Sequence, residues 1–195
     1  LAYSSIAHAG YLLVAVLSAN AYGAAAFLFY LLTYTLMTAG AFGIVIANAK
    51  GLKERNTLED FAGYGWKQPL LGAIFTVFLL SLAGFPLTGG FIGKMFILRS
   101  SLEAGNVVLA AALVLASVIS YFYYLRVIVV MYMRPAAAED AHDHVLLSGP
   151  ARLAVTVSAV AVLALFFMPN WVLGAAQNSV ASLFTVPGAF FGLAP

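Results

Sequence analysis

Long apolar segments separated by short polar loops constrain this chain more than any other feature. Of its 195 residues, 64% are hydrophobic and only 8% are charged, whereas a soluble domain carries about 25% charged residues. Within a bilayer each backbone polar group needs a partner inside the protein, so such segments are expected to form helices. The sequence therefore predicts an all-α membrane protein and argues against a water-soluble fold.

About five segments approach the length of about 20 apolar residues that a transmembrane helix needs. The expected spans lie at about 2–17, 24–49, 69–98, 106–133 and 151–173, with polar loops at 50–68 and 134–150 and a tail at 174–195, all in one transmembrane domain. The mildly apolar tail is predicted to form a short interfacial helix. The first span is short and the chain does not begin with Met, so we expect an N-terminal portion to be missing.

The third expected span, 69–98, is interrupted at Gly84-Phe-Pro86. Proline removes a helical hydrogen bond and clashes with the preceding turn. Irregular backbone at membrane depth is tolerated only inside protein or against a water-filled cavity. We therefore predict two half-helices, joined at Gly84–Pro86, that face a hydrated interior.

Lys94 follows this break by about two turns and lies in a stretch with no other charge. A charge at the centre of a membrane helix costs roughly 2.5–3.5 kcal/mol, and such residues mark ion or proton pathways by default. The alternative is a lysine that extends its stem to the membrane surface, and composition alone leaves both interpretations open. The helix break favours the functional one, and lysine, unlike arginine, can give up its proton.

The distribution of basic residues predicts the orientation. One side of the membrane collects the loops with Lys50, Lys53, Arg55, Lys67 and Arg134, whereas the other has only Arg99. The positive-inside rule then places the loops 50–68 and 134–150 in the cytoplasm. Lys94 accordingly lies in the outer half of its span.

His8 shares one helix face with Ser4 and Tyr11, because the three follow the spacing i, i+4, i+7. A buried histidine that merely satisfies its hydrogen bonds and a proton relay are both compatible with this pattern. Tyr30, Tyr34 and Thr38 form a similar stripe, for which hydrogen bonding between helices is the favoured interpretation. The residues predicted to support a polar path are Ser4, Tyr11, Tyr34, Thr38 and Tyr124.

Other polar groups point to less specific roles. Tyr121, Tyr123, Tyr124 and Arg126 favour an aromatic belt at the membrane surface. His142-Asp-His144 has no clear third ligand and is interpreted as a solvated charge run, so no metal site is predicted. The absence of cysteine excludes disulfides and thiolate metal sites. The scattered basic residues do not suggest nucleic-acid binding, and no nucleophile or phosphate-loop motif is present.

Three segments, residues 1–11, 80–94 and 123–126, together resemble the antiporter-like subunits of respiratory complex I, the NADH-quinone oxidoreductase. The resemblance covers almost the whole chain. It is greatest to the bacterial subunit N branch, since subunit M has Glu where Lys94 stands. It implies that the chain is the C-terminal part of a fourteen-helix antiporter-like fold, with helices ten to fourteen and a discontinuous twelfth.

The resemblance also implies roles. Lys94 would be the proton-exchange group of an outward half-channel, and His8 would belong to the hydrated central axis. The chain would be a multi-pass subunit of the bacterial inner membrane and part of a proton-translocating enzyme, a translocase that couples quinone reduction elsewhere to proton transfer. NADH, FMN, iron–sulfur clusters and quinone would bind other subunits, with no cofactor or metal on this chain. Subunit M, small subunits such as K and J, and lipid would be its partners.

Two alternatives remain open. A cation/proton antiporter or a membrane-bound hydrogenase of the same superfamily would share the broken helix and its lysine. A structural membrane anchor without a proton path, in which Lys94 only reaches the membrane surface, belongs to a different class. Replacing Lys94 in the assembled complex separates the anchor from the transporters.

Overall fold

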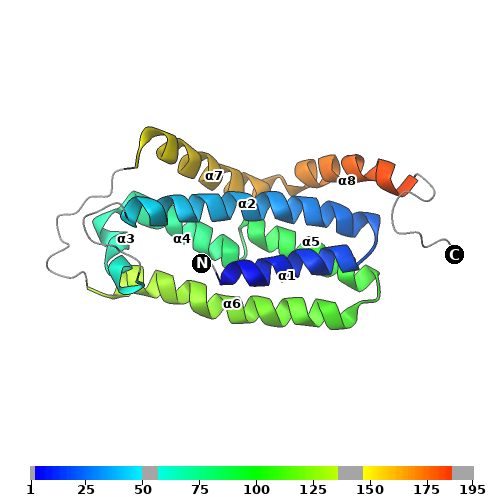
Figure 1. Cartoon of the computed structure of the whole chain (residues 1–195), viewed down its shortest axis with the longest axis horizontal. Coiled ribbons are helices and arrows are strands. Elements are labelled where there is room, and N and C mark those ends of the chain that lie inside the picture. Colours follow the sequence, from blue (N-terminus) through cyan, green and yellow to red (C-terminus); the bar gives the residue numbers. More distant parts are fainter. Residues whose placement is uncertain (1–2, 50–56, 136–146, 186–195) are drawn as a thin grey trace.

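The computed structural model of the chain describes residues 3–49, 57–135 and 147–185, and within these ranges it contains helices and no strand (Figure 1). This confirms the all-α prediction. The elements are α1 Ser4–Leu17, α2 Ala21–Ala49, the 3-10 turn η1 Glu59–Phe61, α3 Tyr64–Lys67, α4 Pro69–Ala83, α5 Gly89–Glu103, α6 Val107–Met133, α7 Gly149–Phe167 and α8 Pro169–Thr185.

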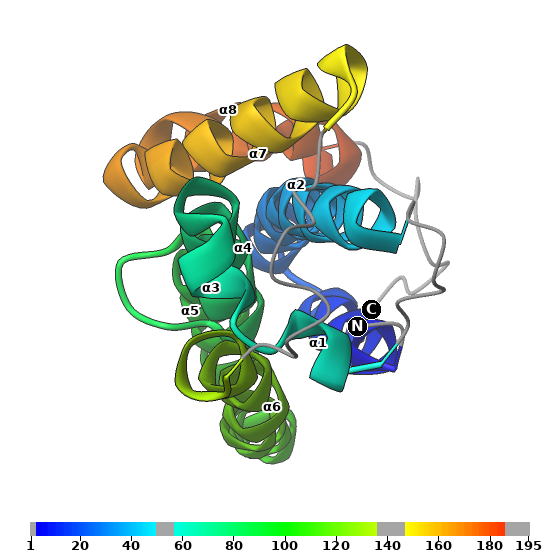
Figure 2. The same cartoon turned by 90° about the vertical axis from the view of Figure 1, so that its left-hand side faces the viewer.

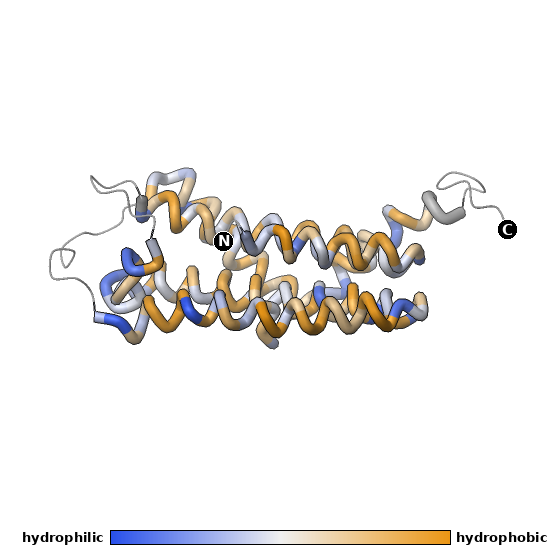
Figure 3. Tube along the Cα trace, turned by 60° about the horizontal axis from the view of Figure 1, so that its bottom comes forward, coloured by the Kyte–Doolittle hydropathy of each residue, from blue (hydrophilic) through white to orange (hydrophobic). Residues whose placement is uncertain are grey.

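The long helices have the length and composition of membrane spans. Among the described residues, α2, α6 and α7 are each apolar and long enough to cross a bilayer. A fourth span is formed if the segment Glu59–Lys67 and α4, which meet at an angle of 119°, are taken together. At 1.5 Å per residue, α2 and α6 are roughly 40 Å long, more than the about 30 Å of bilayer hydrocarbon. Figure 3 shows apolar residues along the middle of the long helices and most hydrophilic ones near the two ends.

The expected third span is two half-helices, as predicted. α4 ends at Ala83 and α5 begins at Gly89, and the two follow one another along the long axis of the bundle (Figure 1). The intervening residues Phe85, Pro86 and Leu87 are exposed.

The expected fifth span, 151–173, differs from the structure. α7 ends at Phe167, and α8 begins at Pro169, so the chain is broken at Met168. Proline cannot donate to the preceding turn, and it drives the residue before it out of the helical region, which agrees with Met168 at φ −128° and ψ 49°. α8 also starts before the tail expected at 174–195. It lies along α2, where Leu173 packs in a cluster with Ala25 and Phe29 (Figure 1).

α2 is the centre of the bundle. It contacts α1, α4, α5, α7 and α8, and in the end-on view α7 and α8 lie on one side of it and α1 on another (Figure 2). The outward faces of α6 and α7 carry large apolar side chains such as Val108, Phe122 and Leu153, which are 81%, 74% and 67% exposed in this chain. Such surfaces suit lipid or other membrane helices.

The two charged loops depart from the same end of the bundle. The indole nitrogen of Trp66 donates to the carbonyl of Tyr132 at 2.8 Å, and the guanidinium of Arg134 pairs with Glu59 at 2.7 Å. These contacts join the first polar loop to the end of α6, where the second begins. The charged loop residues at 50–56 and 136–146, His142 and His144 included, lie outside the described residues.

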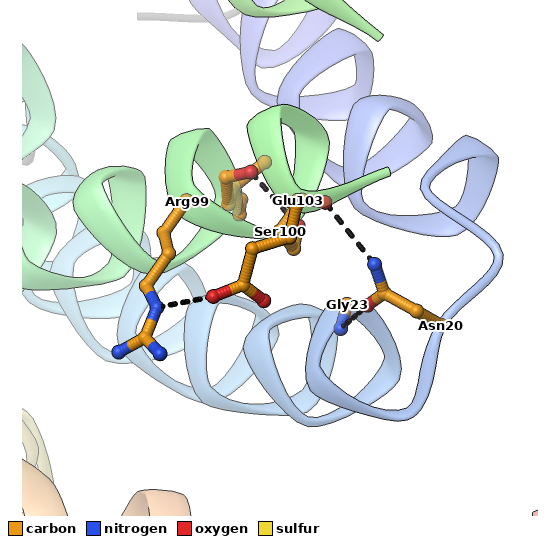
Figure 4. A network of polar contacts seen from close by, with 6 residues as sticks. Asn20, Gly23, Arg99, Ser100 and Glu103 are labelled. Carbon is orange, nitrogen blue, oxygen red and sulfur yellow. Dashed lines mark hydrogen bonds and ion pairs between the residues drawn. The ribbon is translucent and has the colours of Figure 1, made fainter. Parts of the chain in front are cut away.

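A polar network holds the opposite end (Figure 4). The Asn20 amide donates to the carbonyl of Ser100 at 3.1 Å and accepts from the backbone N–H of Gly23 at 2.6 Å. The hydroxyl of Ser100 in turn contacts that of Ser18 at 3.2 Å, while Arg99 and Glu103 pair on the exposed face of α5. Asn20 thus caps α2 and ties the α1–α2 turn to the end of α5.

Asn20→Ala is expected to lower the free energy of unfolding by about 1–2 kcal/mol, because it removes a helix cap and an interhelical hydrogen bond. Thermal unfolding of the detergent-purified protein measures the change. The matched control is Asn178→Ala on the exposed face of α8, which should change little. Equal stability of the two variants would contradict the anchoring role of Asn20.

Candidate functional site

The break between α4 and α5 is a defined turn. The N–H of Phe85 donates to the carbonyl of Leu80 at 2.9 Å and that of Gly84 to Ser81 at 3.0 Å. This pair of bonds is the Schellman ending, which needs a left-handed residue, and Gly84 supplies it with φ 86°. Across the break, the N–H of Gly90 donates to the Ser81 hydroxyl at 3.1 Å, so α5 starts against the end of α4.

Lys94 lies in the second turn of α5 and points back to this ending. Only 5% exposed, its Nζ donates to the carbonyl of Ala83 at 2.7 Å and to that of Leu82 at 3.2 Å. These carbonyls form the negative end of the α4 dipole, which favours a cation. The ammonium also lies 4.7 Å from the centre of the Tyr11 ring, a cation–π distance. Lys94 therefore does not extend to the bundle surface.

Gly84 is needed here for space as well as for its backbone angle. A Cβ at this position would lie 2.9 Å from Cδ and 3.0 Å from Nζ of Lys94. The absence of a side chain therefore lets the lysine approach the end of α4.

His8 is fully buried between three helices. Its Nδ1 is 2.7 Å from the hydroxyl of Tyr30 on α2, and its Nε2 is 3.0 Å from that of Tyr124 on α6. A neutral imidazole donates through one nitrogen and accepts through the other, whereas both phenol oxygens can accept from an imidazolium. The Tyr34 ring stacks on the imidazole at 4.6 Å. His8 can therefore be neutral or protonated and keep its hydrogen bonds to both Tyr30 and Tyr124.

Tyr11 lies between the two buried titratable residues, His8 and Lys94. Its ring lies 5.5 Å from that of His8 and 4.7 Å from Nζ of Lys94. A single aromatic residue thus contacts the buried histidine and the buried lysine.

Several hydroxyls in the bundle interior are buried without a hydrogen-bond partner among the described residues: those of Tyr11, Thr38, Ser117 and Tyr123. Buried polar groups normally pair with protein or with ordered water. Thr38 also lines a small hollow together with Ser4, Ser5 and Tyr34. The interior around His8 is therefore polar enough to bind water.

The structure brings together most residues singled out in the sequence. Lys94, Tyr11, His8, Tyr34 and Tyr124 are linked by the contacts described above. Ser4 and Thr38 line the hollow beside Tyr34, Gly84 forms the break, and Pro86 lies in its exposed loop.

The aromatic-belt interpretation is wrong for two residues. Tyr124 is 1% exposed and bonds to His8, and the Tyr121 hydroxyl donates to the carbonyl of Gly84 at 2.8 Å. Both face the bundle because α6 turns this part of its surface toward α1 and α4. The interhelical role favoured for Tyr30 is confirmed by its bond to His8. The sequence pattern does not mark Ser120, and it assigns Tyr121 to the belt, because a hydroxyl in an apolar helix does not reveal which side of that helix faces the bundle.

Across residues 3–49, 57–135 and 147–185, no group of three or more His, Cys, Asp or Glu side chains could hold a metal ion.

Comparison with known proteins identifies relatives among membrane subunits of NADH-quinone oxidoreductases. Residues 1–120 match the family described as NADH:quinone oxidoreductase/Mrp antiporter, transmembrane. NADH-quinone oxidoreductase subunit N of Trichlorobacter lovleyi is 46% identical over 180 residues, which cover 92% of this chain and 37% of the relative. Subunit N 1 of Solibacter usitatus is 46% identical over 185 residues, or 94% and 37% of the two chains. The chain therefore spans little more than a third of these relatives.

Solved structures with a similar fold come from respiratory complex I and from an Mrp complex. A chain of respiratory complex I from Thermus thermophilus with bound aureothin aligns with a TM-score of 0.74 and 38% identity, over 90% of this chain and 39% of that one. A chain of the Mrp complex from Dietzia sp. DQ12-45-1b aligns with a TM-score of 0.76 over 94% and 42%, but with 22% identity, so the likeness is one of fold.

Proposed function

We propose that this chain, which belongs to the NADH:quinone oxidoreductase/Mrp antiporter transmembrane family, is part of a proton-translocating membrane subunit of a bacterial NADH:quinone oxidoreductase. The observation that carries the proposal is Lys94, a buried cation at the broken helix that is joined through Tyr11 to the buried His8. The identities of 46% and 38% to oxidoreductase chains favour this enzyme over an Mrp-type antiporter, where identity is 22%.

Lys94 is the proton-exchange group in this proposal. As an ammonium it is stabilised by the Leu82 and Ala83 carbonyls and by the Tyr11 ring, while burial makes its charge costly. A second positive charge nearby makes the ammonium less favourable, so Lys94 releases a proton toward the outside and becomes a neutral amine. The amine then takes up the next proton from the interior. Arginine could not perform this cycle because it stays protonated.

His8 is the inner relay. A proton that reaches one ring nitrogen leaves from the other, and the phenols of Tyr30 and Tyr124 rotate to accept and donate in turn. Water on the unpaired hydroxyls of Tyr11, Ser117 and Tyr123 would complete the path to Lys94. Ser4, Tyr34 and Thr38 extend the polar surface on the other side of His8.

The remaining assignments follow from the same proposal. The chain lies in the bacterial inner membrane with loops 50–68 and 134–150 in the cytoplasm. The antiporter-like subunit M and small subunits such as K and J cover part of its surface. The redox cofactors and the quinone bind other subunits, and coupling reaches Lys94 through charge and conformation.

His8→Phe tests the relay. The phenyl ring keeps the stacking on Tyr34 but deprives Tyr30 and Tyr124 of a polar partner. We expect proton transfer through this subunit to fall by about 100-fold or more. The measurement is a lower number of protons translocated per NADH oxidised in vesicles with the assembled complex.

The matched control is Leu13→Phe, which places the same ring on the exposed face of α1 and should leave translocation unchanged. Native gels verify that both variants assemble. Unchanged translocation in His8→Phe would remove His8 from the path.

A further inference from the structure

The last carbonyls of α4 point into the bundle, and their partners come from different parts of the chain. A helix end leaves four carbonyls without partners inside the helix. Those of Leu80 and Ser81 accept from the N–H groups of Gly84 and Phe85 in the turn itself. The next ones, of Leu82 and Ala83, accept from Nζ of Lys94.

α6 reaches the same turn with two consecutive hydroxyl residues. The Tyr121 hydroxyl donates to the carbonyl of Gly84 at 2.8 Å, and Ser120 lies 3.4 Å from the carbonyl of Ala83. Ser120 makes its shorter bond, 2.6 Å, to the carbonyl of Ser117 in its own helix. Tyr121 therefore makes the stronger polar contact between α6 and the turn.

The bond from Tyr121 matters because Gly84 is the flexible residue of the turn. Glycine adopts left-handed and right-handed backbone angles with similar ease, so sterics alone do not hold Gly84 at φ 86°. Rotation of this residue would turn the neighbouring peptide of Ala83 and with it the carbonyl that Lys94 binds. The N–H groups of Gly84 and Phe85 oppose this rotation from within the turn, and the bond from Tyr121 adds a restraint from α6.

We propose that Tyr121 is a positioning residue for Lys94. By holding the carbonyl of Gly84, it keeps the carbonyls of Leu82 and Ala83 directed at Nζ. Tyr121 thereby acts on the lysine through the turn and takes no proton itself. This role rests on the proposed function, in which Lys94 exchanges protons.

The test is Tyr121→Phe in the assembled complex, with protons per NADH oxidised measured in vesicles over a range of pH. Loss of one neutral hydrogen bond predicts about a five-fold fall in translocation through this subunit, together with a shift of its pH profile. The matched control is Tyr132→Phe on the same helix, whose hydroxyl contacts Thr76 at 3.4 Å. It should change neither quantity.

A second arm separates positioning from simple support of the fold. In a Lys94→Ala background, Tyr121→Phe should cause no further fall in whatever translocation remains, since a residue acting through Lys94 has nothing left to position. A further fall would overturn the proposal, and so would a Tyr121→Phe variant that matches Tyr132→Phe while Lys94→Ala is inactive. If Lys94→Ala itself translocates normally, the proposed function fails and the role of Tyr121 with it.

Discussion

Replacing Lys94 with alanine is expected to abolish proton transfer through this subunit. Groups that donate and accept a proton at the reacting position contribute about 100-fold or more to rate, and the chain places no other described cation beside the break. Vesicles containing the assembled complex should therefore translocate fewer protons per NADH oxidised. The loss should equal the whole contribution of this subunit.

Lys94→Arg is the informative comparison. Arginine keeps a positive charge and can donate to the Leu82 and Ala83 carbonyls, so the turn retains its partners. It cannot release a proton, and translocation is expected to be lost as in the alanine variant. If arginine restores translocation, charge rather than exchange is what the site requires. If both variants translocate normally, Lys94 is not on the path and the structural-anchor alternative is favoured.

Gly90→Ala is expected to have the largest effect on the fold. A Cβ at this position would lie 1.9 Å from the backbone oxygen of Ser81, and a backbone atom cannot rotate away as a side chain can. α5 would have to withdraw from the end of α4. Overpacking of this kind costs about 3 kcal/mol, which should lower the thermal stability of the detergent-purified protein and impair translocation.

Gly10→Ala is the matched control for this substitution. It lies in α1 with nothing within 4 Å of the added carbon, and alanine in a helix is more stable than glycine by roughly 0.5–1 kcal/mol. The control should therefore be neutral or slightly stabilising. Gly90→Ala and Gly10→Ala with equal melting temperatures would show that α5 does not pack on α4 as described.

The sequence predicted the membrane class and the position of the first helix break. Both depend on signals that act within a few residues: the length of an apolar run, and Gly84 with Pro86. The same local rule also explains the second break at Met168, where Pro169 stands inside an apparently continuous apolar segment. A continuous span at 151–173 is nevertheless expected from hydropathy, because the hydropathy average over a long window is little changed by one proline.

The partners of the candidate site could not be predicted in the same way. The pattern at Ser4, His8 and Tyr11 indicated a polar face, but not that His8 bonds to Tyr30 and Tyr124. Those contacts join residues far apart in the sequence. They depend on how each helix is rotated and shifted along the bundle axis, which neighbouring side chains decide.

Gly40 illustrates how packing sets these positions. A Cβ there would lie 2.1 Å from the ring of Phe78, so the ring of α4 is seated directly on the α2 backbone. A glycine in an apolar segment does not reveal which ring it will accept. The register of α4 against α2, and with it the placement of the break, follows from such contacts.

The length of the apolar runs, the Gly84-Phe-Pro86 break and the charge of Lys94 are local properties, so the amino-acid sequence is enough to predict a membrane bundle with a lysine beside a broken helix. The groups that surround the Lys94 ammonium follow from helix packing and cannot be predicted from local patterns. Lys94 donates to the carbonyls of Leu82 and Ala83 and contacts the Tyr11 ring. Tyr121 of α6 bonds to the next carbonyl of the same turn, that of Gly84. Backbone carbonyls are chemically the same in every residue, and which of them lack a partner depends on where helices end and what packs against those ends.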